Sequence, residues 1–588
     1  MAIIIGFAAL FVASFWMWPL LCGDSELDSI RWPLAYGLSL GAMTLAMAII
    51  GLWPGQWLNA VAVWGLVAAA ALVGGFTLFR SGATLKLPRV GEAWQSLRSG
   101  SLRHWTILTL ASVFFIVLAF ATYYPFIGED EISRYAFFAK RIWLDQSLQP
   151  GTRGYPMLMA LAYAFTFFAS GAIFDQLAKL TPVLFALMTL LATFALARRW
   201  GGHERAGWAA TVSLAATPLF VNWWGVGYVD IPAALYLVLS AYAADVWLEK
   251  KRLRWAALAG ALAGLGMWTK QSDFVALPAL GGVFAFTFGR DWSKGDRNGA
   301  WQTIGAGSLA LASAFVGGGW WYARNAVYDG WAAAVPGPGL FYVNFAERTW
   351  ANVLPFAGHL PDFGYITGPL YAIALGVALF RFVRRNAPAG YVWALAWSIP
   401  YSVLWFLFFS YDTRFLLTVL PFFAVLVGIA SSKLDRTISR PLARWTITLG
   451  VAAVCALGVS GRLGGAYHWL VNPFRTNEQR LAYAKPDLAE AVAFLRDHTD
   501  PSASVITMDG RLLYYLMGRP YAESYPSSAA AVIREADYLV VGGWAEYSVY
   551  PYLGSGKTDL FTALRDPAQF EQVFITHDGR LTVYRVVK

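Results

Sequence analysis

The sequence predicts a polytopic α-helical membrane protein with about 14 transmembrane helices and a C-terminal soluble α/β domain. Of its 588 residues, 58% are hydrophobic and only 14% are charged, whereas a soluble domain carries about 25% charged residues. Apolar runs of about 20 residues recur along the chain, and each can cross a hydrocarbon core of roughly 30 Å. This composition excludes soluble, disordered and fibrous proteins. The two cysteines, Cys22 and Cys455, lie in or beside apolar runs, which excludes a disulfide framework and a cysteine-based metal site.

Basic residues gather in short polar stretches between the apolar runs and predict which side of the membrane each loop faces. Nearly half of the 45 Lys and Arg residues lie in these stretches, with few acids, so the positive-inside rule places them in the cytoplasm. The net charge of +10 therefore reflects topology, with lipid headgroups rather than nucleic acid as the expected partner. The predicted cytoplasmic stretches are 80–104, 198–205, 249–254, 290–297, 381–385 and 433–444.

The number of crossings between two cytoplasmic stretches must be even, which tests this topology. Three apolar runs lie between 80–104 and 198–205, so one of them should not cross. We expect the shortest, 156–173, to lie at or dip into the outer leaflet. The first three crossings and the loop after them form an extra N-terminal region, 1–104. The predicted crossings are 1–21, 33–53, 57–79, 105–126, 177–197, 205–224, 228–248, 255–268, 271–288, 302–324, 365–383, 390–410, 415–432 and 445–465.

The composition changes after residue 465. Segment 466–588 has 12 Lys and Arg against 14 Asp and Glu and alternates between helical and strand-like patterns. This pattern predicts a small soluble α/β domain, which the last crossing places outside. The expected elements are a helix near 486–498 and strands near 504–508, 538–541, 570–576 and 581–587.

Three consecutive acids in the outer loop 127–155, Glu129-Asp130-Glu131, form the first candidate site. Carboxylates held together at a membrane surface are expensive to bury, and one could serve as a general base or a metal ligand. The alternative is a helix N-terminus, where acids favour the helix dipole and Arg134 pairs with Asp130 or Glu131.

Four further charged residues lie at predicted helix ends on the outer side. Asp230 precedes Pro232 and is either a site residue or a helix cap. Taken alone, each of three basic residues is explained as an anchor at the membrane surface: Lys270, Arg324 and Arg414. Three cations on the outer face nevertheless break the positive-inside pattern, so we expect an anionic ligand on that side. The sequence contains no HExxH or Walker A motif, which leaves zinc hydrolase and soluble nucleotide chemistry without support.

Five short motifs follow one another on the predicted outer side, and their order carries a family resemblance. They are Asp130-Glu131, Gly154-Tyr155-Pro156-Met157-Leu158, Gly225-Val226-Gly227-Tyr228-Val229-Asp230, Trp320-Trp321-Tyr322-Ala323-Arg324-Asn325, and Tyr411-Asp412-Thr413-Arg414-Phe415-Leu416-Leu417 with Pro421. In this order they resemble the glycosyltransferase C superfamily, which includes protein O-mannosyltransferases, lipid A aminoarabinose transferases and oligosaccharyltransferase catalytic subunits. The resemblance covers about 105–435, within an expected membrane core of 105–465.

The resemblance implies a sugar donor carried on a polyprenyl phosphate and a transfer that inverts the anomeric centre. The leaving phosphate is already ionised, so Lys270, Arg324 and Arg414 are expected to bind it. Asp130 is then the expected catalytic base, beside Glu131, which orients it or the acceptor.

The remaining residues of these motifs receive supporting roles in the same expectation. Arg134 would keep the two carboxylates ionised, and Tyr155, Asp230, Tyr322 and Tyr411 would contact or orient the substrate. Some branches of the superfamily require a divalent cation, so Asp130 and Asp230 are also candidate ligands for Mg²⁺ or Mn²⁺.

The resemblance further implies a bacterial cytoplasmic (inner) membrane, with the active site and the domain 466–588 in the periplasm. The acceptor is a glycan, a lipid or a protein. Three alternatives remain: a non-catalytic subunit that binds lipid-linked glycans, a polymerase or ligase with a diphosphate-linked donor, and a secondary transporter. The transporter would use Asp130, Asp230 and Lys270 as a charge relay near the bilayer midplane.

Overall fold

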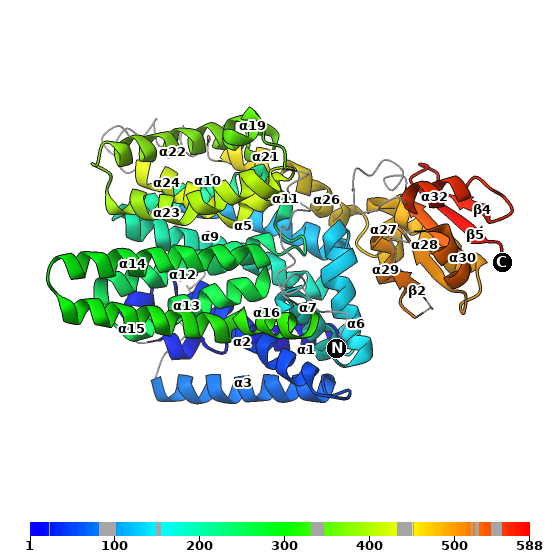
Figure 1. The fold of residues 1–588 in the computed structure, drawn as a ribbon, viewed down its shortest axis with the longest axis horizontal. Coiled ribbons are helices and arrows are strands. Elements are labelled where there is room, and N and C mark those ends of the chain that lie inside the picture. Colours follow the sequence, from blue (N-terminus) through cyan, green and yellow to red (C-terminus); the bar gives the residue numbers. More distant parts are fainter. Residues whose placement is uncertain are drawn as a thin grey trace.

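A bundle of long helices and a smaller domain at one of its ends make up the computed structural model (Figure 1). The structure describes residues 1–22, 24–81, 102–148, 155–330, 346–431, 450, 452–518, 521–523, 528–542 and 556–588. Most of the predicted basic stretch 80–104, all of 433–444 and part of the outer loop 127–155 lie outside the described residues. The N-terminus lies at the end of the bundle that faces the small domain (Figure 1).

Eight helices of the described residues are long and apolar enough to cross a membrane. Each overlaps one of the predicted crossings. They are Ala2–Leu21, Arg31–Gly51, Ala60–Ser81, Thr106–Tyr123, Asp175–Gly201, Asp230–Lys250, Gln271–Ser293 and Ala389–Phe409. Five of the other six predicted crossings coincide with shorter, broken or less apolar helices, and 445–465 lies partly outside the described residues, so the total of 14 stays a prediction. Segment 205–224, for example, is divided into α10 (Glu204–Ala215) and α11 (Pro218–Trp223), since Pro218 interrupts the helical hydrogen bonds.

The remaining helices of the bundle have the following bounds. They are α1 (Ala2–Phe15), η1 (Trp18–Leu21), η2 (Ser25–Leu27), α2 (Arg31–Leu52), α3 (Ala60–Ser81), α5 (Leu102–Tyr123), η3 (Glu131–Ala136), α6 (Phe137–Asp145), α7 (Leu158–Ser170), α8 (Asp175–Ala178), α9 (Leu180–Gly201), α12 (Asp230–Lys250), α13 (Leu253–Thr269), η5 (Gln271–Val275), α14 (Ala276–Ser293), α15 (Arg297–Ala314), η6 (Phe315–Gly319), α16 (Trp320–Asp329), α19 (Trp350–Val353), α20 (Pro355–Gly358), α21 (Leu360–Phe363), α22 (Thr367–Val383), α23 (Ala389–Leu404), η7 (Trp405–Phe409), η8 (Thr413–Thr418) and α24 (Leu420–Ser431).

The core of the bundle is built around α12, which packs against α9 and α13, while α13 packs against α15. Small residues allow the last pair to approach closely. A methyl group at Gly260 would clash with the backbone carbonyl of Ala310, and such small-residue contacts are common between membrane helices. This packing fixes the position of the first residue of α12, Asp230, and of the residue that follows α13, Lys270.

Helix α7 corresponds to the segment that parity predicts not to cross. It has 13 residues and is therefore only about 20 Å long, too short for a hydrocarbon core. Every one of its residues is buried, and it packs against α1, α2, α3 and α6. Protein rather than lipid surrounds it, so α7 forms an internal support for the loop that carries Asp130.

The C-terminal domain contains a five-stranded mixed sheet with the order β2-β1-β3-β5-β4. Strand β1 (Val505–Thr507) is parallel to β2 (Tyr521–Glu523) and β3 (Tyr538–Gly542), while β5 (Leu581–Val586) is antiparallel to β3 and β4 (Phe570–Ile575). Four of these strands lie where the sequence pattern predicts them. Strand β2 was not predicted. The helices are α27 (Asn477–Ala484), α28 (Pro486–His498), α29 (Arg511–Leu516), α30 (Ala529–Glu535) and α32 (Gly556–Ala563).

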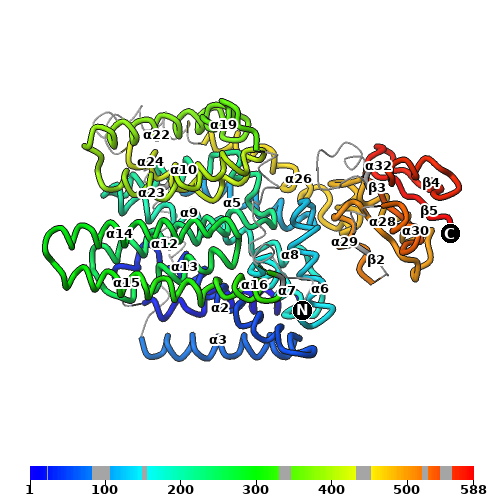
Figure 2. Tube along the Cα trace, viewed as in Figure 1, coloured from blue at the N-terminus to red at the C-terminus, as the bar shows by residue number. Residues whose placement is uncertain are grey.

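The first of two connections between the domain and the bundle is formed by η10 (Ser460–Arg462) and α26 (Leu463–Val471). Helix α26 packs along α5. The tube in Figure 2 follows the chain from α26 into α27 and the sheet. The second connection is a packing contact, in which α29 lies against η3 and α6 of the first outer loop. The domain therefore contacts the segment that begins at Asp130.

Candidate functional site

Five charged residues from four separate segments meet at the ends of helices and form one charge cluster: Asp130, Asp230, Lys270, Asp412 and Arg414. Asp130 immediately precedes η3, and Asp230 is the first residue of α12. Lys270 links α13 to η5, while Asp412 and Arg414 lie at the start of η8. All five lie at helix ends, which does not favour a charge relay in the middle of the membrane.

The carboxylates and cations of the cluster are within ion-pair distance. Lys270 Nζ donates to Asp230 Oδ1 at 2.6 Å, and Arg414 Nη1 donates to Asp130 Oδ2 at 3.0 Å. Arg414 Nε lies 3.4 Å from Asp412 Oδ2 and 3.8 Å from Asp230 Oδ2. Arg414 therefore connects all three acids, and four residues predicted separately as outer-face charges belong to one cluster.

Local structure explains how two of the acids are presented. The Asp412 side chain accepts from the Arg414 backbone N–H at 2.8 Å and caps η8, so capping brings the two charges together. Asp230 is the first residue of α12, and the N-cap residue is Val229. The carboxylate of Asp230 is directed to Lys270 instead, and the interpretation of Asp230 as a helix cap is therefore wrong.

Aromatic rings surround the two cations. The guanidinium of Arg414 lies 5.1 Å from the ring centre of Trp223, 4.6 Å from that of Tyr228 and 5.2 Å from that of Phe415. Lys270 Nζ lies 4.7 Å from the ring centre of Phe415. Ring faces attract cations, and these rings also exclude water, which strengthens the charge interactions inside the cluster.

The protonation of the cluster follows from burial and charge. Burial lowers the pKa of Arg414, but Asp230, Asp130 and Asp412 outweigh it and raise the pKa overall. The pKa of Lys270 is also raised, because Asp230 outweighs the effect of burial. Burial raises the pKa of Asp412 against the opposing effect of Arg414. Both cations therefore remain charged at neutral pH.

Exposure and hydrogen bonding distinguish the members of the cluster. The side chains of Asp412 and Asp130 are 33% and 26% exposed, whereas those of Arg414 and Asp230 are 13% and 3% exposed. Within the described residues, the buried Nε of Arg414 has no hydrogen-bond partner. A buried donor without a partner is costly, and a ligand anion would satisfy it. Asp130 and Asp412 are thus the accessible acids, and Asp412 is already engaged as the cap of η8.

Glu131, predicted beside Asp130 as catalytic, is fully buried. Its Oε2 accepts from the backbone N–H groups of Ile127 and Gly128 at 2.9 and 2.8 Å, and its Oε1 accepts from Gly227 at 2.7 Å. A Cβ at Gly227 would collide with Glu131, which accounts for the glycine. Glu131 thereby ties the first outer loop to the loop before Asp230, an arrangement that favours a positioning role.

Arg134 and Tyr155 adjoin the cluster. Arg134 Nε lies 3.5 Å from Asp130 Oδ1, and its guanidinium lies 4.9 Å from the ring centre of Tyr155. The carbonyl of Tyr155 accepts from Trp321 Nε1 at 3.0 Å. The motif Trp320–Asn325 thus reaches the first loop through Trp321.

Three other predicted residues do not make described contacts with the charge cluster. Tyr322 is buried and its hydroxyl donates to the carbonyl of Met267 at 2.7 Å, which is a contact between helices. The contacts described for Arg324 lie within its own helix, on Trp321, Asn325 and Tyr328. Tyr411 packs edge-on against Phe415, one ring away from the cations.

The arrangement does not favour the predicted metal site at Asp130 and Asp230. Arg414 lies between the two carboxylates and pairs with both, and Lys270 holds the remaining oxygen of Asp230. Over the described residues, no group of three or more His, Cys, Asp or Glu side chains is placed to hold a metal ion. The donor set therefore does not fit a divalent cation in this arrangement.

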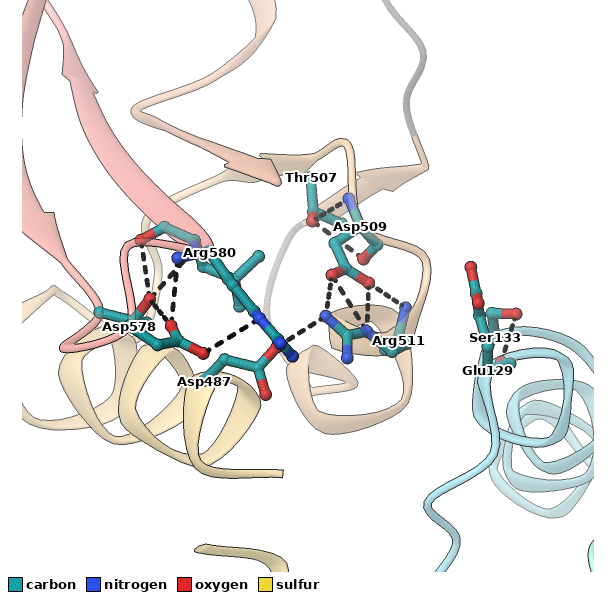
Figure 3. A network of polar contacts seen from close by, with 10 residues as sticks. Glu129, Ser133, Asp487, Thr507, Asp509, Arg511, Asp578 and Arg580 are labelled. Atoms are coloured by element: carbon teal, nitrogen blue, oxygen red, sulfur yellow. Dashed lines mark hydrogen bonds and ion pairs between the residues drawn. The ribbon is translucent and has the colours of Figure 1, made fainter. Parts of the chain in front are cut away.

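The C-terminal domain closes one side of the first loop. Figure 3 shows Glu129 and Ser133 facing α29 and the group formed by Asp487, Asp509 and Arg511. A Cβ at Gly510 would lie 3.0 Å from Cβ of Ser133. Burial, Asp130 and Asp509 raise the pKa of Glu129, which links the domain electrostatically to the cluster.

Specific hydrogen bonds hold this junction together. Tyr514 Oη donates to Asp175 Oδ1 at 2.5 Å, and Lys140 Nζ donates to the Tyr514 carbonyl at 2.6 Å. Tyr515 Oη donates to the Phe126 carbonyl at 3.3 Å. The domain thereby fixes both ends of the segment that contains Asp130.

Several residues of the site were not predicted. Asp412, Tyr228 and Phe415 lie within the motifs and Trp223 lies in an apolar run, but the sequence predicts no role for them. Glu129 is one of three consecutive acids. A signal exists for Asp412, because an acid two residues before a cation at a helix start both caps the helix and pairs with the cation. The aromatic frame has no comparable signal, since Trp and Tyr are frequent at all membrane interfaces.

Comparisons with known proteins agree with this fold. Residues 155–317 match the model of the dolichyl-phosphate-mannose-protein mannosyltransferase family. ArnT from Cupriavidus metallidurans bound to undecaprenyl phosphate is similar in structure, with 15% sequence identity, a TM-score of 0.54, and coverage of 82% of this chain and 97% of ArnT. The apo state of ArnT gives 16% identity with the same coverage and TM-score. No curated protein sequence matches the chain.

The likeness to ArnT extends over most of both chains and concerns the fold, and the family match lies inside the membrane core. The order of the motifs on the outer loops, the charge cluster they form and the helical architecture point in the same direction. The chain is therefore a polytopic membrane protein with the fold of the glycosyltransferase C superfamily.

Proposed function

We propose that the chain is an inverting glycosyltransferase that moves a sugar from a polyprenyl-phosphate donor to an acceptor hydroxyl. The proposed site is the charge cluster, on the periplasmic face of a bacterial inner membrane. The observation that carries the proposal is Arg414, which pairs with Asp130, an accessible acid that makes no side-chain capping hydrogen bond, and whose buried Nε has no hydrogen-bond partner among the described residues. That ArnT was solved with undecaprenyl phosphate supports a lipid phosphate as the donor group.

Departure of the phosphate from the sugar donor requires cations rather than a general acid. The bond between the anomeric carbon and the phosphate oxygen breaks, and its electron pair leaves on an already ionised phosphate. Arg414 and Lys270 are buried cations of fixed position, which stabilise such a charge far better than exposed ones. A planar guanidinium can also bind two phosphate oxygens at once.

Asp130 is the proposed general base. The acceptor oxygen attacks the anomeric carbon from the face opposite the phosphate and forms the new glycosidic bond. Its proton passes to Asp130, whose side chain is exposed enough to reach an acceptor hydroxyl. Protonation of Asp130 weakens its pair with Arg414, so the guanidinium becomes available to the phosphate in the same step.

The supporting residues divide the remaining tasks. Asp230 holds Lys270 in place, and Glu131 fixes the loop geometry through its three backbone contacts. Arg134 borders the accessible side of Asp130, where the acceptor would enter. Arg324, which makes no described contact with the cluster, and Tyr411 stay candidates for contact with the lipid phosphate or the acceptor.

The test is turnover of polyprenyl-phosphate sugars by the full chain in lipid nanodiscs. Mass spectrometry would follow the release of polyprenyl phosphate across several donor sugars and acceptor extracts. Asp130→Asn is compared with Asp145→Asn, because Asp145 pairs with Arg141 on α6 and makes no described contact with the cluster. We expect release by the wild type and by Asp145→Asn, but not by Asp130→Asn.

Two other results would replace the proposal. Donor binding that Arg414→Ala abolishes, with no turnover of any donor, would indicate a subunit that binds lipid-linked glycans. Turnover that is specific to diphosphate-linked donors would indicate a polymerase or ligase.

A further inference from the structure

A cavity lies at the same end of the bundle as the C-terminal domain but apart from the charge cluster. Its volume is about 620 Å³, and α1, α5, α9 and α27 contribute to its walls. None of Asp130, Asp230, Lys270, Asp412 or Arg414 lines it. It therefore belongs to a different part of the surface from the proposed active site.

The cavity lies at the depth of lipid headgroups. It is lined by residues from the first turns of the spans Ala2–Leu21 and Asp175–Gly201 and from the last turn of Thr106–Tyr123. The ends of hydrophobic spans coincide with the boundary between hydrocarbon and headgroups. Next to the cavity, α26 and the residues after it expose Leu470 and Phe474, as a segment that rests on a membrane does.

One wall of the cavity suits an acyl chain. Ile3, Ile4 and Phe7 of α1 are largely exposed and line the cavity together with Leu177 and Leu180. These side chains form an apolar surface along the outside of a membrane-spanning helix, where a lipid tail would bury them. A soluble anion alone would leave this wall exposed.

The residues that the C-terminal domain contributes to the lining suit an anion. Arg475 and Arg480 line the cavity beside Thr476 and Asn477, at the N-terminus of α27, where the helix dipole is positive. No carboxylate lines the cavity. The nearby acid Glu478 lies outside the lining, and its Oε1 accepts from Arg496 Nη1 at 2.6 Å.

Arg480 provides the independent sign of a missing partner. It is only 9% exposed, and its Nη1 and Nη2 donate to the carbonyls of Tyr123 and Pro473 at 2.9 and 2.8 Å. Its Nε has no hydrogen-bond partner within the described residues. A buried guanidinium whose described partners are carbonyls and rings, and not a carboxylate, is a suitable binding group for phosphate.

We propose that this cavity binds one anionic phospholipid from the leaflet on the side of the C-terminal domain. Its phosphodiester would contact Arg475 and Arg480, hydroxyl groups of its headgroup would reach Thr476 and Asn477, and one acyl chain would lie along α1. The lipid would thus connect α1, which belongs to the extra N-terminal region, to the C-terminal domain. Its site is separate from that of the proposed sugar donor.

The experiment is native mass spectrometry of the full chain released from nanodiscs that contain phosphatidylglycerol, phosphatidylcholine and polyprenyl phosphate. The test variant is Arg475→Gln, because Arg475 makes fewer structural contacts than Arg480. The matched control is Arg580→Gln, since Arg580 is an exposed arginine of the same domain, is paired with Asp578 and is not part of the cavity. We expect one retained phosphatidylglycerol on the wild type and on the control, with retention about tenfold weaker in Arg475→Gln.

Several outcomes would overturn the proposal. Equal retention of phosphatidylcholine would show that the negative charge is not recognised. Unchanged retention in Arg475→Gln would place the lipid elsewhere, and displacement by inorganic phosphate would show that the apolar wall does not contribute. Preferential retention of polyprenyl phosphate, lost in Arg475→Gln, would assign the cavity to the carrier lipid instead. The competition among lipids on the wild type needs no variant and does not depend on any variant folding.

Discussion

Two arginines, Arg414 in the charge cluster and Arg511 in the C-terminal domain, each lie among several acids but are satisfied to different degrees. Arg511 donates from Nε and Nη2 to Asp509 and from Nη2 to Asp487, with distances of 2.6 to 3.1 Å. Arg414 makes one side-chain hydrogen bond, to Asp130, and its Nε stays without a hydrogen-bond partner among the described residues. The first group is complete without a ligand, whereas the second is not.

The acids that pair with the two arginines also differ in their distance along the sequence. Asp509 and Asp487 lie 2 and 24 residues from Arg511 and belong to the same domain. Asp130 lies 284 residues from Arg414 and is held in place by other parts of the fold. A satisfied local group stabilises a domain, while an unsatisfied group assembled from distant segments indicates a binding site. Variants of the two groups should therefore affect different measurements.

The largest expected effect is on turnover in Asp130→Asn. Loss of the proposed base should reduce kcat by a factor of about 10²–10⁴, while the fold is retained because Arg414 keeps Asp230 and Asp412. The matched change in the other group is Asp487→Asn. It should lower the free energy of unfolding by about 1–3 kcal/mol, because Asp487 is buried, and leave kcat per folded molecule unchanged.

The two measurements are the initial rate of polyprenyl phosphate release and the thermal unfolding midpoint in the same detergent. If Asp487→Asn reduced kcat as strongly as Asp130→Asn, the comparison between the two groups would be wrong, and the domain would take part in the chemistry.

The second-largest effect is expected on kcat/KM in Arg414→Lys, which changes the shape of the cation. In Arg414→Lys the charge stays, but the planar fork that reaches several carboxylates and a phosphate is lost. We expect kcat/KM to fall about 10–100-fold, from weaker stabilisation of the leaving phosphate. Arg511→Lys should instead lower the unfolding midpoint with kcat/KM unchanged. Steady-state kinetics at saturating acceptor would contradict the proposal if Arg414→Lys matched the wild type.

The sequence predicts the members of the charge cluster better than it predicts their contacts. Asp130, Asp230, Lys270 and Arg414 were identified because charges at the outer ends of apolar helices are costly and the cations break the positive-inside pattern. Tyr322 has the same appearance in sequence, yet its hydroxyl contacts the carbonyl of Met267. Hydropathy shows where a helix ends, but which face of that helix points to a site depends on packing with distant helices.

Prediction of the fold from the sequence has a similar limit. The long apolar helices and four of the five strands were predicted, since their periodicities extend over enough residues. Strand β2 has three residues, Tyr521–Glu523, and is defined by pairing with β1 rather than by its own pattern. Glu131 was expected at the reacting centre, because nothing local distinguishes it from Asp130. Its burial follows from the approach of Gly227, 96 residues away.

A moderate effect on stability is expected for Glu131→Gln. The carboxylate accepts three backbone N–H groups, and an amide would turn an NH₂ group toward at least one of these donors. The free energy of unfolding should fall by about 1–3 kcal/mol. Thermal unfolding of Glu131→Gln and of the control Asp145→Asn checks this. A fully stable Glu131→Gln with abolished turnover would restore the prediction that Glu131 is catalytic.

The smallest effect is a pH dependence at the junction between the two regions. Burial, Asp130 and Asp509 raise the pKa of Glu129 in the folded protein above its ordinary value of 4.5. The folded state therefore favours protonated Glu129, and this contribution to stability is lost as the pH rises from the ordinary pKa through the raised one. Glu129→Gln removes the titration, so its unfolding midpoint should equal that of the wild type near pH 4 and exceed it by pH 7.

The size of this difference is limited, because the Glu129 side chain keeps contact with solvent. We expect about 1 °C at pH 7, measured as the difference in unfolding midpoint between Glu129→Gln and the wild type across the pH range. The control is Glu478→Gln. Glu478 is an exposed acid of the C-terminal domain and pairs with Arg496 of that domain. A difference of the opposite sign at pH 7 would mean that ionised Glu129 is stabilised by Arg511 and Arg414, and that the domain is attracted to the charge cluster rather than repelled by its acids.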